Sequence, residues 1–207
     1  MINVKKRLLA LAAENGLAPA LLQLPDCEVA PETTRVMMIN EVPPTDPAQG
    51  FYNTAADSDY MRSTLGLFHA AGVQVNSMQD ILDFGIYITT AVKSPKTGYT
   101  VEPGVIQAHL PLLKGELGLF PQLQVIMCMG DVAKKTVNMI VKADTGKNVI
   151  PSGATGRLRH NEYWWGDMRV FPSYIMTGKN LLIEPFKRDC VAEDIGKMMA
   201  LVHVPRA

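Results

Sequence analysis

The sequence has few cysteines and no pattern that would let them work together. Its 207 residues include three cysteines, Cys27, Cys128 and Cys190, and none of them belongs to a C-x-x-C pair. A zinc site, an iron–sulfur cluster or a dithiol redox couple therefore has no support in the sequence. We expect neither a metal nor a cofactor, and we expect Cys128, within "QVIMCMGD", to be a buried apolar residue.

Long apolar runs and the common catalytic motifs are also missing. Runs such as "VIMCM" and "ALLQL" are far shorter than the roughly 20 residues that cross a bilayer. The N-terminal segment has no signal-peptide cleavage pattern, so we expect a cytoplasmic protein without a membrane partner. No P-loop, G-x-G-x-x-G, H-E-x-x-H or G-x-S-x-G motif occurs, which gives the corresponding enzyme classes no support.

The formal net charge is zero, but the charges are unevenly distributed along the chain. Residues 134–188 contain ten Lys or Arg and four acidic residues, whereas the first 133 residues contain eight basic and thirteen acidic ones. A zero net charge argues against a large overall attraction to nucleic acid. The basic C-terminal half is typical either of a solvated face or of a surface that follows a phosphate backbone.

Short apolar runs alternate with helical patterns over the whole chain, which predicts a parallel sheet covered by helices on both faces. The predicted strands cover residues 35–40, 85–92, 124–129 and the segment "RVFPSYI" from Arg169. The predicted helices cover residues 2–15, 57–71, 102–120, a segment that starts at Gly130, and the closing "AEDIGKMMALV". We therefore expect a single three-layer α/β/α domain over residues 1–207, with a central four-stranded parallel sheet and a hairpin insert at about 150–168.

Ligands of such sheets bind beyond the carboxyl ends of the strands, so the loops after Asn40, Thr90, Met129 and Tyr174 are the candidate site. Glu41 follows the first strand directly, and a rigid Pro43–Pro44 turn comes next. A carboxylate fixed there can orient or deprotonate a water molecule, although taken alone the pattern is more typical of a solvated turn with an incidental glutamate.

Three segments resemble the uracil-DNA glycosylase superfamily, most closely the bacterial and archaeal branch whose first motif reads GEAPG. "INEVPP" is similar to that motif and retains Glu41 and Pro43. "YITTAVK" is similar to the family's YITNVVK strand end, and "VFPSYIMT" is similar to its VFPTYHPS. The resemblance covers about residues 33 to 180 and implies the uracil-DNA glycosylase fold.

The resemblance implies that the protein hydrolyses the N-glycosidic bond of a damaged or deaminated base flipped out of DNA, as in base excision repair. It assigns Glu41 the placement of water near the sugar and gives stacking on the base to Phe51 or Tyr52. The implied base pocket comprises Asn40, Val42, Pro43, Phe51, Tyr52, Thr90 and Ile175.

The chain departs from the family pattern at Asn40, Pro44, Met176 and Thr177, and it lacks the iron–sulfur cysteines of the most similar branch. Two further substitutions change the chemistry of the base pocket. Thr90 stands in place of the asparagine that reads the pyrimidine edge, and Ile175 in place of the histidine that stabilises the leaving base. Loss of such a donor typically costs about 2.7 to 4 kcal/mol of transition-state stabilisation. Either the pocket serves another base, with Glu41 as the main catalytic group assisted by Ser173 or Thr177, or the domain binds DNA or a nucleotide without catalysis. Hydrolysis of a free nucleoside or nucleotide is a third possibility.

DNA, duplex or single-stranded, is the expected partner. The predicted backbone contacts are Lys93, Thr177, Gly178 and Lys179, and further candidates are Lys96, Arg157 and Arg159. Met176 or Lys179 is the candidate wedge that enters the base stack. Trp164 and Trp165 more often indicate hairpin packing than a wedge.

Overall fold

The computed structural model of the protein describes residues 1–52, 58–177 and 184–203. Five strands of the described chain form the central sheet, in the order β4-β3-β5-β7-β6. Strands β3 (Val36–Asn40), β4 (Ile86–Thr90), β5 (Val125–Met129) and β7 (Met168–Ser173) run parallel. The predicted parallel arrangement of four strands is confirmed, but the predicted strand count is wrong.

The fifth strand, β6 (Tyr163–Trp165), pairs antiparallel with β7 at one edge of the sheet. It lies in the segment predicted as a hairpin insert, at about 150–168, and it forms a hairpin with β7, the predicted fourth strand. The hairpin extends the sheet because β7 is its second strand. A separate two-stranded sheet joins β1 (Ile2–Asn3) to β2 (Glu28–Val29).

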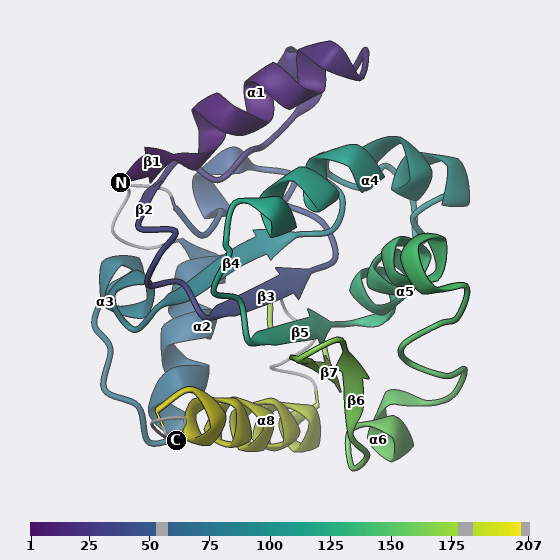
Figure 1. The fold of residues 1–207 in the computed structure, drawn as a ribbon. Coiled ribbons are helices and arrows are strands. Elements are labelled where there is room, and N and C mark those ends of the chain that lie inside the picture. Colours follow the sequence, from purple (N-terminus) through teal and green to yellow (C-terminus); the bar gives the residue numbers. More distant parts are fainter. Residues whose placement is uncertain (53–57, 178–183, 204–207) are drawn as a thin grey trace.

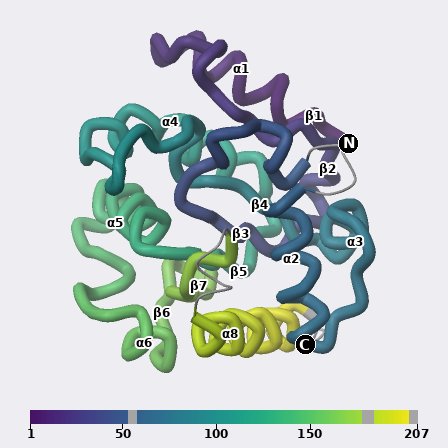
Figure 2. Tube along the Cα trace, turned by 180° about the vertical axis from the view of Figure 1, so that it is seen from behind, coloured from purple at the N-terminus to yellow at the C-terminus, as the bar shows by residue number. Residues whose placement is uncertain are grey.

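Helices cover both faces of the sheet, as Figures 1 and 2 show. One face packs against α1 (Val4–Glu14), α4 (Pro103–Gly118) and α5 (Asp131–Thr145). The other packs against α2 (Asp59–Ala70), α3 (Met78–Asp83) and α8 (Pro185–His203). Short helical turns are η1 (Pro19–Leu21), η2 (Pro47–Gln49) and α6 (Thr155–Leu158). Because both faces are covered, every residue of β3, β4 and β5 is buried.

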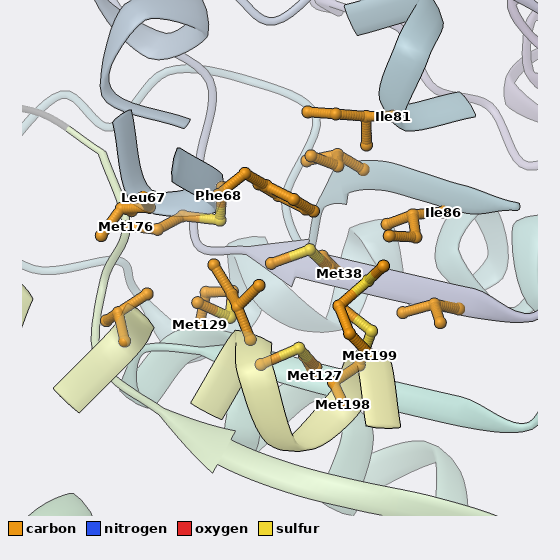
Figure 3. Packing of buried hydrophobic residues seen from close by; sticks show 14 of the residues in the cluster. Met38, Leu67, Phe68, Ile81, Ile86, Met127, Met129, Met176, Met198 and Met199 are labelled. Atoms are coloured by element: carbon orange, nitrogen blue, oxygen red, sulfur yellow. The ribbon is translucent and has the colours of Figure 1, made fainter. Parts of the chain in front are cut away.

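Methionines fill much of the space between the sheet and α8, as Figure 3 shows. This methionine cluster consists of Met38, Met127, Met129, Met176, Met198 and Met199. Unbranched thioether side chains adapt to irregular gaps between a twisted sheet and a helix. Met176 has no exposed surface, so the structure contradicts its predicted role as a wedge in the base stack.

Candidate functional site

The carboxyl ends of the parallel strands bring the predicted site residues to one edge of the sheet. Asn40, the last residue of β3, is in register with Thr90, the last residue of β4. Met129 at the end of β5 is likewise in register with Ser173 at the end of β7. The loops that follow these strands therefore lie beside one another.

Glu41 follows strand β3, and its side chain lies beside the N-terminus of helix α5. The residue is half-buried. Its Oε1 accepts a hydrogen bond of 3.0 Å from the backbone N–H of Val132, in the first turn of α5. Gly130 connects β5 to α5 as the N-cap residue of the helix, with a φ of 107°. A Cβ at Gly130 would lie 2.5 Å from Glu41 Oε1 and 2.7 Å from Ile175 Cγ1. The side chains of Glu41 and Ile175 thus both pack against Gly130, where no larger residue fits.

The surroundings of Glu41 favour its protonated form more than water does. Burial raises the pKa of this carboxyl, and the nearby charge of Asp131 raises it further. Hydrogen bonds from the N–H groups of Val132 and Asp131, and the charge of Lys96, act in the opposite direction. The carboxylate is therefore a better proton acceptor than an exposed glutamate, and it remains anchored at the positive end of a helix.

Tyr60 of α2 is a member of this site that sequence reasoning missed. Its hydroxyl donates a long hydrogen bond of 3.4 Å to the carbonyl of Val42 and also hydrogen-bonds with the side chain of Thr177. Burial raises the pKa of Tyr60, and the charge of Glu41 contributes. The signal available in the sequence was its position, a tyrosine in the first turn of the helix that follows the Glu41 loop.

Phe51 and Tyr52 have different environments. The Tyr52 hydroxyl donates to the carbonyl of Ile88 at 2.9 Å and accepts from the N–H of the same residue at 3.0 Å. Its ring is stacked with that of Tyr87 at a centroid distance of 6.4 Å. Phe51 is in edge contact with Tyr60, with ring centroids 5.1 Å apart. Phe51 is therefore the aromatic side chain that belongs to the Glu41 and Tyr60 group, whereas Tyr52 is committed to strand β4.

A cavity of about 700 Å³ opens beside Thr90. Pro43, Phe51, Tyr52 and Thr90 line it together with residues 20–26. Within the described residues, Glu41 and Ile175 do not line this cavity. The predicted pocket residues are thus divided between the cavity and the group around Gly130.

Asn40 lies next to both parts of the site. Its side chain is 1% exposed, and among the described residues neither Nδ2 nor Oδ1 has a hydrogen-bond partner. Leaving a buried donor or acceptor unpaired costs about 1–3 kcal/mol.

Lys93 is located inside the protein, contrary to the prediction that it contacts phosphate. Its side chain is 0% exposed and forms an ion pair with Glu116 of α4. Its ammonium also donates to Thr89 Oγ1 at 2.7 Å and to the carbonyl of Thr90 at 2.5 Å. Lys93 therefore fixes the end of β4 from within.

Arg159 is also buried, where its guanidinium binds Asp194 of α8 and the half-exposed Glu193. The Ser173 hydroxyl donates to Asp194 at 2.7 Å, which directs this side chain toward α8. These contacts contradict the phosphate role of Arg159. They also commit the Ser173 hydroxyl to Asp194, although it was predicted to assist catalysis.

The remaining predicted DNA contacts have mixed locations. Lys96 and Arg157 are exposed, whereas Thr177 is buried and hydrogen-bonded to Tyr60. The buried Thr177 hydroxyl therefore lies within the site and not on a surface that meets phosphate. Gly178 and Lys179 lie outside the described residues.

The two tryptophans of the hairpin also differ. Trp165 is half-buried and packs against the core on the α1, α4 and α5 face, as expected for hairpin packing. Trp164 is 51% exposed, and the guanidinium of Arg169 lies 5.7 Å from the centre of its ring.

No protein-family model matches the chain, and a comparison with curated proteins finds no match. None of the described helices combines the length and apolar character needed to span a membrane. Over residues 1–52, 58–177 and 184–203, no three His, Cys, Asp or Glu side chains are grouped as metal ligands.

Proposed function

We propose that this protein hydrolyses the N-glycosidic bond of a damaged or deaminated base in DNA, in a domain of the uracil-DNA glycosylase superfamily. The observation that carries the proposal is the environment of Glu41. Its carboxylate is half-buried at the carboxyl edge of the sheet, held by the Val132 N–H, and has a raised pKa. Such a group suits a reaction in which water attacks a sugar that becomes positively charged.

In this reaction the bond between the base nitrogen and C1′ of the sugar breaks, and the oxygen of a water molecule bonds to C1′. Glu41 accepts a proton from that water, and its negative charge stabilises the developing charge on the sugar. The base leaves with the bonding electron pair and takes up a proton from solvent, and Glu41 later releases the proton of the attacking water to solvent. Because an ionised carboxylate has about four acceptor sites, the bond from Val132 to Oε1 leaves capacity for the water.

The departing base needs a hydrogen-bond donor, and Ile175 has none. Tyr60 supplies a hydroxyl in the same region, where it contacts Thr177 and where the charge of Glu41 raises its pKa. Tyr60 and Thr177 are therefore the side chains that we assign to the leaving base.

The test is a base-release assay on duplex and single-stranded oligonucleotides that carry uracil, hypoxanthine, xanthine or oxidised pyrimidines. The control is Glu41→Gln, because a glutamine oxygen can still accept from Val132 while the amide cannot accept the proton of water. We expect release by the wild-type protein and a loss of about 10² to 10⁴-fold in the variant. Equal rates for both proteins would refute the role of Glu41.

The hydrocarbon side chain of Ile175, packed beside Glu41, favours a second candidate, a DNA- or nucleotide-binding domain without catalysis. This candidate predicts no base release from any substrate but retained binding. A salt titration separates DNA from a free nucleotide as ligand, because affinity that depends on many phosphate contacts falls steeply as salt rises.

A further inference from the structure

The buried amide of Asn40 has no evident role in the folded protein itself. Buried polar side chains are nearly always hydrogen-bonded, yet both polar atoms of Asn40 lack partners in the described residues. An apolar residue of similar size would suit a 1% exposed position better. The amide is therefore best explained by a ligand that pairs with it.

The strand geometry places this amide on the face of the sheet that carries α2 and α8. Val36 and Met38 of β3 belong to the core on that face, and side chains alternate along a strand, so Asn40 shares it. The same alternation puts Thr90, in register with Asn40, on this face after Ile86 and Ile88.

Phe51 packs in the same core cluster, and Glu41 is the next residue in the chain. The unpaired amide therefore lies at the carboxyl edge, on the same face of the sheet as the threonine and the aromatic ring and one residue before the carboxylate of the proposed site.

A carboxamide carries a donor and an acceptor side by side in one plane. The edges of uracil, hypoxanthine and xanthine present an N–H next to a C=O, which complements both atoms at once. Thr90 has a single rotating hydroxyl and cannot form such a two-bond pair.

We propose that Asn40 reads the edge of the flipped base, so that strand β3 supplies the amide that Thr90 on β4 does not. This inference rests on the proposed function. It makes Asn40 the residue that determines specificity, and it names bases with neighbouring N–H and C=O groups as the substrates. Glu41, one residue further, acts on the sugar of the same nucleotide.

The first measurement is stability, because the free protein should not need the amide. Asn40→Leu is expected to leave the midpoint of urea unfolding unchanged or to move it to higher urea. Asn138 is a matched control, since its amide makes hydrogen bonds of 2.7 and 2.9 Å with the backbone of Ile150. Asn138→Leu is expected to lower the midpoint. A similar fall for Asn40→Leu would mean that its amide has a partner in the free protein, and would overturn the inference.

The second measurement is the affinity for duplexes that contain uracil, hypoxanthine or xanthine, each compared with a duplex that carries an abasic-site analogue. Asn40→Leu and the smaller change Asn40→Ala should both reduce the preference for the base-containing duplex by about tenfold or more. Binding to the abasic duplex should stay unchanged. The double variant Asn40→Gly/Thr90→Asn, which moves the amide to β4, should recover part of the preference.

The outcomes separate the two proposals. A wild-type protein that shows neither base preference nor base release would refute the proposed function, and this inference with it. A wild-type preference that survives in Asn40→Leu and Asn40→Ala would refute the role of Asn40 alone and leave the function of the site in place.

Discussion

Replacing Lys93 by methionine should be among the most destabilising single changes in this protein. The side chains of Lys93 and Glu116 are both 0% exposed, and they form an ion pair. Methionine fills the space of the lysine stem but leaves the Glu116 carboxylate buried without a counterion. Two hydroxyl donors remain on that carboxylate, Tyr87 at 2.6 Å and Thr89 at 2.7 Å, and they do not neutralise it. Breaking one side of a buried pair typically costs about 3–5 kcal/mol, and we expect a loss of this size.

A double-mutant cycle tests whether the loss comes from the pair. In Lys93→Met/Glu116→Gln no charge is buried, and the glutamine oxygen can still accept from Tyr87 and Thr89. The double variant should therefore be more stable than Lys93→Met. Urea unfolding followed by circular dichroism gives the free energies, with unchanged slopes as the sign that the denatured state is comparable. Lys5→Met is the control, because the Lys5–Asp26 pair is exposed and should contribute less than about 1 kcal/mol. The reasoning would be refuted if the stability losses of Lys93→Met and Glu116→Gln summed to the loss of the double variant within about 0.5 kcal/mol.

Three further predictions concern the Glu41 site. Gly130→Ala should destabilise the protein by about 1–3 kcal/mol and more than Gly146→Ala in thermal unfolding, because both glycines have positive φ but only Gly130 lacks room for a Cβ. Burial raises the pKa of Glu41, so its ionisation costs stability as pH rises from the unfolded pKa through the folded one. The melting temperature of Glu41→Gln minus that of the wild type should therefore increase from acid to neutral pH. A difference that does not change with pH would contradict this. Tyr60→Phe should keep the fold, judged by circular dichroism, but slow base release about tenfold or more, and an unchanged rate would remove the hydroxyl from the mechanism.

Strands β3, β4 and β5 could be predicted because each is a short, largely apolar run, a pattern typical of a sheet that is covered on both faces. Strand β6 was not predicted as a sheet member because it has three residues and its central side chain, Trp164, is half exposed. Helix α3 has only six residues, too few to show a helical period. Some helix boundaries differ from the predicted ones for local reasons. Helix α1 begins at Val4 and not at residue 2, because the side chain of Asn3 accepts a hydrogen bond from the Lys6 N–H and caps the helix.

The site was harder to predict than the fold because it depends on contacts between distant segments. Lys93 and Arg159 look like surface cations in the sequence, and nothing local shows that Glu116 and Asp194 lie beside them. Glu41 could be selected because it follows a buried strand, but its bond to Val132 joins residues far apart in the chain. The unpaired state of Asn40 is a property of the packed structure and has no signature in the sequence.

Tyr52 also has a consequence for how this protein meets other chains. Strand β4 forms one edge of the sheet, and such an edge normally offers free N–H and C=O groups to a strand from another molecule. At Ile88 both groups are already bonded to the Tyr52 hydroxyl. A second copy or an extended peptide therefore cannot lengthen the sheet at this point without displacing the tyrosine, so Tyr52 protects the protein against self-association along β4.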